Sequence, residues 1–177
     1  MMKEGLLDLN EAVQYPGKRL VFNFFTALSE DDEIELVEPL QGHIEAVSAG
    51  SQLQITTACR GKCILDCARC GVPIEAEFDF DSEDWFEVDG VPSMYATDGH
   101  AKIVSDEPTP IFKNNTLLRD AYIRQEVWVN LPTQPLCAYG WEGTCPNDTA
   151  PHELAPGAQT DGSPFSRLKG LTVEDEK

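Results

Sequence analysis

The sequence has 177 residues, of which 41% are hydrophobic and 25% are charged, so one domain with a buried core is expected. Thirteen Lys and Arg against 31 Asp and Glu give a formal net charge of -18, which disfavours binding to nucleic acid phosphates and favours basic protein partners. No stretch approaches the roughly 20 apolar residues of a membrane span, and the N-terminus lacks a signal-peptide pattern, so we expect a cytoplasmic protein.

Strand patterns fill the first half of the chain. Residues 6–10 suit an edge strand or a loose arm, and the apolar, aromatic run 18–28 follows a Pro-Gly turn. The acidic run 30–38 leads into another strand. A hairpin is then predicted, with one strand over 44–48, a turn over 49–51 and a return strand from Leu53.

Two alternating patterns follow the hairpin turn. If the return strand stays extended to Cys67, then Cys59 and Cys63 share a face with it, and Arg60 and Lys62 lie on the other face. Residues 74–81 alternate strictly between apolar and acidic side chains, which indicates a half-buried antiparallel strand. Its carboxylates, which share the solvent face, are Glu75, Glu77, Asp79 and Asp81.

The second half of the chain is less regular. Residues 89–110 are rich in Gly, Pro, Ser, Thr and Asp and suggest a mobile loop. Residues 114–116 offer a helix cap, a helix is predicted over 117–129, and Pro132 ends it. We therefore predict an α+β fold: a single antiparallel, β-rich domain (residues 1–146), with one main helix packed on the sheet. A polar tail, 147–177, would carry a short docking helix at 164–171.

The six cysteines favour reduced thiols or metal ligands over disulfides in a chain without an export signal. A Cys-x-x-Cys pair supplies two ligands of a tetrahedral zinc site from one turn. The best completion of one structural zinc site is Cys67 and Cys70 with Cys137 and Cys145. The alternative is free thiols, with Cys59 and Cys63 in the core.

A thiol-disulfide redox protein using Cys67 and Cys70 is the rival from another functional class. Against it, the motif is followed by Gly-Val-Pro and a strand, whereas redox Cys-x-x-Cys motifs sit at a helix N-terminus. No phosphate loop, nucleophile elbow or His-Glu-x-x-His motif is present in the sequence, so we expect a protein that is not an enzyme.

Several motifs in order resemble the YceD-like family. Cys-Ala-Arg-Cys at 67–70 resembles the family's Cys-x-Arg-Cys knuckle, and the acidic strand, the helix and Leu-Pro-Thr-Gln-Pro-Leu-Cys at 131–137 follow as they do there. Gly-Thr-Cys-Pro at 143–146 and the segment 164–171 also have family counterparts. In contrast, Trp141 and Asp148 stand where fuller members carry further cysteines, so a second metal knuckle is incomplete.

The resemblance implies a role in accumulation of large-subunit ribosomal RNA, as an accessory factor for large ribosomal subunit assembly, without supplying a mechanism. Two binding hypotheses come from charge. The acidic strand could hold a basic large-subunit ribosomal protein, or Arg60, Lys62 and Arg69 could form a cationic tip that contacts pre-ribosomal RNA. The net charge favours the first. The same residues could also be ordinary solvated surface, with the net charge serving solubility alone.

Overall fold

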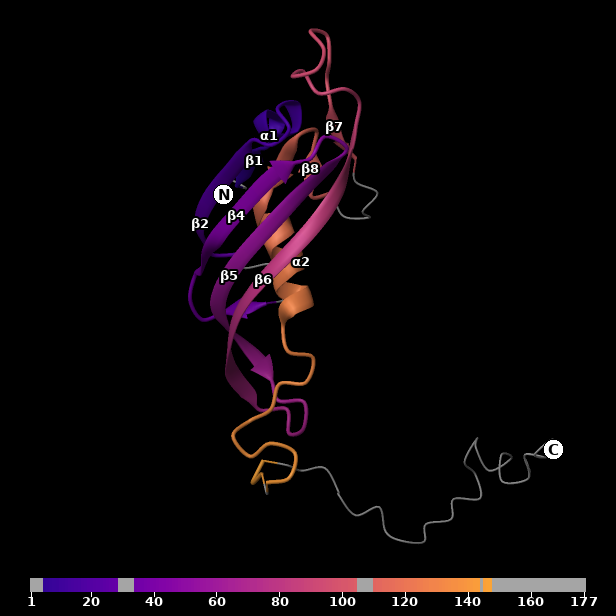
Figure 1. Cartoon of the computed structure of the whole chain (residues 1–177). Helices are drawn as coiled ribbons and strands as arrows, with labels where there is room; N and C mark the ends of the chain where they lie inside the picture. Colours follow the sequence, from indigo (N-terminus) through magenta and orange to yellow (C-terminus); the bar gives the residue numbers. More distant parts are fainter. Residues whose placement is uncertain (1–4, 29–33, 105–109, 144, 148–177) are drawn as a thin grey trace, which may run out of the picture.

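The computed structural model describes residues 5–28, 34–104, 110–143 and 145–147. Most of the described chain is antiparallel sheet (Figure 1). The strands are β1 (Leu6–Asp8), β2 (Arg19–Thr26), β3 (Glu35–Leu36), β4 (Leu40–Ser48), β5 (Gln52–Asp66), β6 (Pro73–Asp89), β7 (Lys102–Val104), β8 (Phe112–Lys113) and β9 (Thr116–Leu118). The helices are α1 (Asn10–Gln14) and α2 (Arg119–Asn130).

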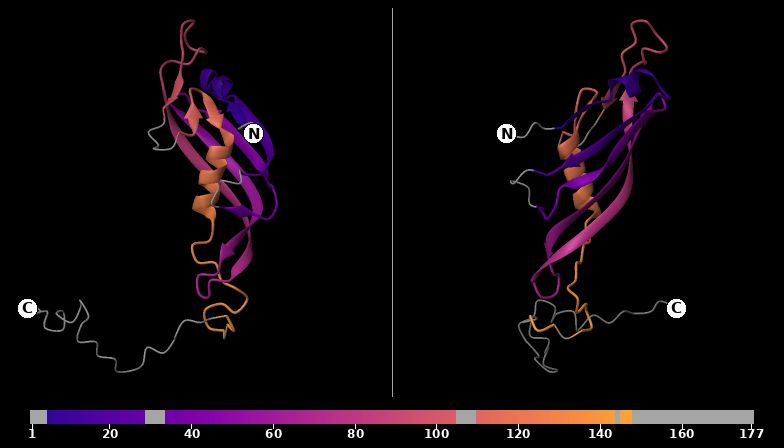
Figure 2. Two further views of the ribbon diagram at one scale, coloured as in Figure 1. Left: turned by 180° about the vertical axis from the view of Figure 1, so that it is seen from behind. Right: turned by 90° about the vertical axis from the view of Figure 1, so that its left-hand side faces the viewer.

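The larger sheet has the strand order β2-β4-β5-β6-β7, with β3 paired to β5 beside β4. Its two longest strands, β5 and β6, pair in one continuous register from Gln52↔Glu87 to Asp66↔Pro73. Because β4 and β2 are shorter, the far end of the β5–β6 hairpin projects beyond them and forms a tip (Figures 1 and 2). That tip carries Cys67 and Cys70.

The two faces of this sheet differ as the alternation predicts. Leu53, Ile55, Cys59 and Cys63 of β5 are buried on the inner face, where they join the core cluster. Gly61 belongs to this face too, since a Cβ there would lie 2.5 Å from Leu40 Cδ2. The outer face carries the exposed carboxylates of β6. The predicted face assignments of β5 and β6 are therefore confirmed.

A second, three-stranded sheet has the order β1-β9-β8 and lies next to α1 and the end of the larger sheet (Figure 2). The buried Asn115 joins these parts, because its Nδ2 donates to Asn10 Oδ1 and Ala101 O, both at 3.0 Å, and its Oδ1 accepts from Ile103 N at 3.0 Å. The prediction that residues 114–116 cap a helix is thus wrong: Asn115 serves the sheet junction, and Leu118 is the N-cap of α2.

The loop predicted over 89–110 is partly ordered by the buried Gln14. Its Oε1 accepts from the amide nitrogens of Ser93 and Ala101 at 3.1 and 3.2 Å, and its Nε2 donates to Ala101 O at 2.8 Å. Strand β7 also forms within this segment and pairs with the end of β6. Residues 105–109 lie outside the described part of the chain.

The predicted α+β class is wrong. Strands make up 47% of the described residues and helices 13%, so the fold is mostly antiparallel β-sheet with two short helices. The described residues do not contain the predicted main helix packed on the sheet. The helix predicted over 117–129 exists as the 12-residue α2, since residues 116–118 are taken by β9. The prediction overestimated the part of the fold that α2 forms, because the two long strands β5 and β6 together contain 32 residues.

Contact between α2 and the larger sheet centres on Tyr122, which is buried. Its hydroxyl donates to Asp84 Oδ2 at 2.7 Å and accepts from Thr57 Oγ1 at 3.1 Å. No helix in the described part of the chain is long and apolar enough to cross a membrane. All but the first residue of the tail predicted over 147–177, including its docking helix at 164–171, lies outside the described residues.

Candidate metal centre

The tip of the β5–β6 hairpin is a tight turn built by residues 67–72. Cys67 N donates to Val72 O at 2.9 Å, and Gly71 N donates back to Cys67 O at 2.9 Å. Gly71 has a φ of 69°, in the left-handed region where a side chain is disfavoured. This local geometry places the thiols of Cys67 and Cys70 together, as a Cys-x-x-Cys turn requires.

A second segment, distant in sequence, descends from α2 to the same tip (Figure 1). Its extended start at Leu131 directs the chain away from the helix. Pro135 O then accepts from Ala68 N at 2.8 Å, and Cys137 N donates to Cys67 Sγ at 3.3 Å. The family-like Leu-Pro-x-x-Pro-x-Cys segment at 131–137 therefore brings Cys137 to the turn that carries Cys67 and Cys70.

The thiols of the two segments form one cluster. The Sγ atoms of Cys67, Cys70 and Cys137 all lie within 4.8 Å of one another, and Cys145 Sγ lies 4.0 Å from Cys137 Sγ. Four sulfurs bound to one zinc at about 2.3 Å lie about 3.8 Å apart, so small shifts close this cluster around an ion. Cys67, Cys70 and Cys137 thus lie close enough to bind a metal.

The surroundings of Cys67 and Cys70 favour ionisation of only one of these two thiols. The amide groups of Cys70, Arg69 and Cys137 donate toward Cys67 Sγ and lower the pKa of Cys67 to about 6. For Cys70, the Val72 amide acts in the same direction, but burial and the neighbouring sulfurs outweigh it and raise its pKa to about 12. One thiolate ringed by amide donors and further thiols is the chemistry of a metal-thiolate knuckle.

The remaining two cysteines stay apart from this cluster. Cys59 and Cys63 are buried on β5 within the hydrophobic core. Burial, with the charge of Asp79, raises the pKa of the Cys59 thiol to about 12, so it stays protonated at neutral pH. Their burial matches the place that the free-thiol alternative gave to these two cysteines.

Arg69, predicted as part of an RNA-binding tip, holds the loop that carries Cys145. Its Nη1 donates to the carbonyl oxygens of Gly140, Trp141 and Gly143 at 2.9, 2.9 and 2.6 Å. Sequence reasoning missed this role. The signal available was the Cys-x-Arg-Cys spacing, which puts a long cationic donor between two thiols.

The other two cations of the predicted tip are also involved in contacts with acidic or polar neighbours. Lys62 Nζ lies 2.9 Å from Glu77 Oε1 and 3.6 Å from Glu75 Oε2, and this pairing raises the pKa of Lys62 and lowers that of Glu77. Arg60 Nη2 donates to Gln41 Oε1 at 3.1 Å. The charge of Lys62 is therefore compensated by carboxylates, whereas the contact of Arg60 is to a neutral amide.

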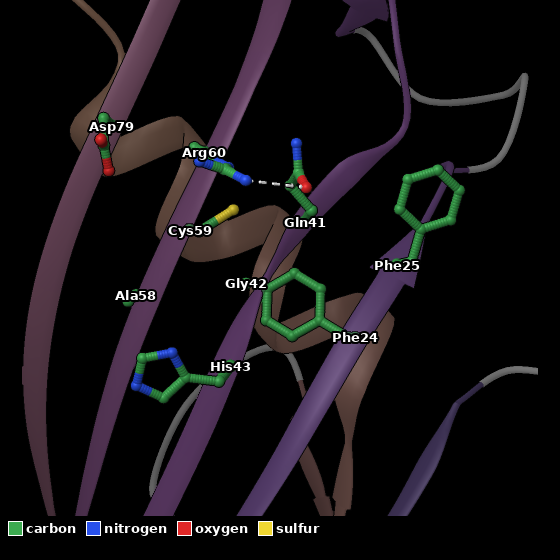
Figure 3. Close-up of a pocket in the computed structure, with 9 residues that line it drawn as sticks. All are labelled: Phe24, Phe25, Gln41, Gly42, His43, Ala58, Cys59, Arg60 and Asp79. Atoms are coloured by element: carbon green, nitrogen blue, oxygen red, sulfur yellow. Dashed lines mark hydrogen bonds between the residues drawn. The ribbon is translucent and has the colours of Figure 1, made fainter.

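Arg60 lies at a shallow cavity of about 450 Å³ between β2, β4, β5 and β6 (Figure 3). Phe24, His43 and Asp79 also line it. Asp79 is the cross-strand partner of Arg60 in the β5–β6 register. The negative charge of Asp79 beside Arg60 would repel a phosphate, so the cavity is a poor phosphate site.

The predicted acidic residues Glu75, Glu77, Asp79 and Asp81 are all exposed on the outer face of β6. They form one row along the strand because every second side chain points the same way. Glu83 continues the row. The hairpin thus carries a thiol cluster at its tip and a line of negative charge along its outer face.

A protein-family model described as "Large ribosomal RNA subunit accumulation protein YceD" matches residues 55–172. The matched region contains β6, α2 and most of β5, and so includes both segments that meet at the thiol cluster. No curated protein and no solved structure gives a significant match.

Proposed function

The chain belongs to the YceD family of large ribosomal RNA subunit accumulation proteins, and on that premise we propose that it is a non-catalytic accessory factor for large ribosomal subunit assembly in the cytoplasm. The family supports a role in large-subunit accumulation. The observation that carries the molecular part of the proposal is the meeting of thiols from two segments 70 residues apart at one tip.

In this proposal the cluster holds one structural zinc ion, with Cys67, Cys70, Cys137 and Cys145 as ligands. Zinc would supply a cross-link between the hairpin and the segment after α2, where the described residues offer few hydrophobic contacts. The donor set fits, since thiolates are the ligands that structural zinc prefers. A fixed tip gives the factor a rigid surface for recognition.

Metal content tests the zinc part of the proposal. Protein purified without a metal-affinity tag is expected to contain about one zinc per chain, and Cys70→Ser to lose it. Cys59→Ala is the matched control, because Cys59 lies in the core outside the cluster, and it should retain the metal. Wild-type protein that contains no metal and has freely titrating thiols would refute the zinc site.

The assembly role is tested in cells from which this protein has been deleted. Deletion is expected to lower the ratio of large- to small-subunit ribosomal RNA, and the wild type and Cys59→Ala should restore it. An unchanged ratio on deletion would refute the assembly role itself. Full restoration by Cys70→Ser would show that the role does not depend on the metal centre.

The proposed partner is a basic large-subunit ribosomal protein, held by the acidic row of β6. Opposite charges across an interface accelerate encounter and select partners. Direct binding of pre-ribosomal RNA is the weaker form of the proposal, because Lys62 and Arg69 are engaged within the chain. Reversing the charge of Arg60 would weaken RNA binding if the tip contacts phosphates and would leave protein binding intact.

A redox role for Cys67 and Cys70 is the alternative, and the low pKa of Cys67 favours it. A nucleophilic thiol must be accessible, whereas Cys67 is 2% exposed and its turn leads into β6 without a helix. The two roles are separated by measuring disulfide exchange before and after treatment with a metal chelator. Exchange in the zinc-loaded protein would favour the redox role.

A further inference from the structure

One long edge of the larger sheet is open within the described part of the chain. β7 pairs with β6 only at Glu87, Val88 and Asp89, whereas β5 pairs with the other side of β6 from Pro73 to Glu87 (Figure 1). Residues 73–86 therefore have a strand partner on one side only among the described residues. An edge of this length presents a row of backbone donors and acceptors that a further strand can use.

The register shows which residues offer these backbone groups. In an antiparallel pair, each residue directs its N–H and C=O to the same neighbour, and successive residues alternate between the two sides. Val88 N donates to Ser51 O at 2.9 Å, so even-numbered residues face β5. Because the register continues unbroken to Pro73, odd-numbered residues 75–85 direct their backbone groups to the open side.

These same odd-numbered residues carry the carboxylates of the outer face. Glu75 and Glu77 already pair with Lys62. Asp79, Asp81 and Glu83 make no ion pair with a described residue. This part of the edge therefore combines unpaired backbone groups with uncompensated negative charge at every second residue.

We propose that residues 79–85 of β6 bind an extended segment of a basic protein as an added strand, in which Lys or Arg recurs at every second position. Directly opposite side chains in a strand pair have Cβ atoms about 4.5–5.5 Å apart, which brings each cation next to a carboxylate. This inference rests on the proposed function, for which it supplies the mode of recognition of a basic partner.

The other side of the added strand would be apolar at its two ends. Even-numbered residues of β6 point to the inner face, where Phe80 and, just beyond the segment, Phe86 are only partly buried. Between them lie the polar Ser82 and Asp84, and Asp84 accepts a hydrogen bond from Tyr122. Apolar side chains between the cations would cover these rings. The partner's pattern is thus a cation at every second position over about seven residues, with apolar residues near the ends, each residue rising about 3.4 Å along the strand.

Charge excludes two other occupants. A second copy of this edge would bring like charges directly opposite one another, which is destabilising. RNA would bring phosphates beside the carboxylate row and has no peptide groups to continue the sheet. A basic extended polypeptide satisfies both the backbone and the charge of the edge.

Two synthetic peptides of about nine residues test the inference, since each would span about 30 Å when extended. Both contain the same numbers of Lys and Val, alternating in one and in two blocks in the other. The alternating peptide is expected to bind the full chain about tenfold more tightly at about 0.15 M salt, because only it places each cation opposite a carboxylate. Methylation of its edge-facing amide nitrogens should abolish the difference.

Two variants locate the site on the protein. Asp79→Asn with Asp81→Asn should weaken binding of the alternating peptide about five- to tenfold, and the control Asp98→Asn with Glu142→Gln, at exposed positions off the edge, should not. Asp81→Pro should weaken it by a similar factor, because the lost N–H faces the open side and not β5.

Equal affinity for the alternating and blocked peptides would overturn the inference, because nonspecific charge attraction does not depend on spacing. Insensitivity to amide methylation would do the same, and it needs no protein variant that could fail to fold. Neither outcome touches the proposed function, which is judged by ribosomal RNA in cells. Tighter peptide binding after reversing the charges of Arg167 and Lys169 would show that the chain's own tail occupies the edge, and this too would overturn the inference.

Discussion

Replacement of Arg69 by Ala tests whether the arginine of the Cys-x-Arg-Cys motif positions the metal centre. Arg69 Nη1 contacts three carbonyl oxygens of the loop that precedes Cys145. A terminal guanidinium nitrogen has two hydrogens, so two of these contacts are full hydrogen bonds and the third is shared. The loop has no regular secondary structure, and these contacts are its principal polar anchor among the described residues.

The expected loss follows from those bonds. Hydrogen bonds to a charged group contribute about 1.5–3 kcal/mol each, and partial exposure of Arg69 places these two near the lower limit, at about 3 kcal/mol together. The released loop recovers about 1 kcal/mol of conformational entropy. The net cost of about 2 kcal/mol corresponds to about 30-fold weaker zinc binding.

Competition with a chromogenic chelator at neutral pH measures this affinity. Arg60→Ala is the matched control, because it removes the same side chain from the outer face of β5, where it bonds only to Gln41 among the described residues. Arg69→Lys keeps the charge without the planar fork, so it should recover only part of the affinity. If Arg69→Ala binds zinc as tightly as Arg60→Ala, the positioning role is refuted.

Three further predictions concern the rest of the chain. Tyr122→Phe removes two buried hydrogen bonds and should lower the free energy of unfolding by about 1–3 kcal/mol in urea titrations, whereas the exposed Tyr139→Phe should have little effect. Gln14→Ala should accelerate hydrogen exchange of the Ala101 amide; unchanged exchange would contradict the anchoring of that loop. In metal-free protein, the carbon NMR shift of Cys67 Cβ, which needs no reagent to reach this buried thiol, should titrate with a midpoint near 6. Because the pKa of Cys67 is lower in the folded than in the unfolded protein, its thiolate stabilises the metal-free fold at a pH above the unfolded pKa near 9. That stabilisation is lost as the pH falls through 6. A titration midpoint of Cys67 near 9 would refute the lowered pKa.

Local pattern was sufficient for much of the sheet. The alternation over 74–81 and the hairpin turn at 49–51 lie in β6 and between β4 and β5, because side-chain period and turn residues act within a few positions. The sequence pattern gave the wrong fold class and the wrong role for Asn115, which was predicted as part of a helix cap. A helix is visible from its period, but how much of a fold it represents depends on the length of the strands around it.

The candidate site divides in the same way. The sequence alone nominated Cys67, Cys70, Cys137 and Cys145 from residue type and family order. Only the tertiary structure brings them together, since Pro135 and Cys137 must reach the hairpin tip across 70 residues of chain. Spacing in sequence carries no information on such convergence.

Tertiary structure also decided what the charges do. The sequence identified the acidic row of β6 and the cations Arg60, Lys62 and Arg69, but not their partners. Lys62 faces Glu77 across the strand pair, and Arg69 faces loop carbonyls. Composition sets how much charge a protein carries, whereas register and packing decide which charges neutralise one another and which remain open to a partner.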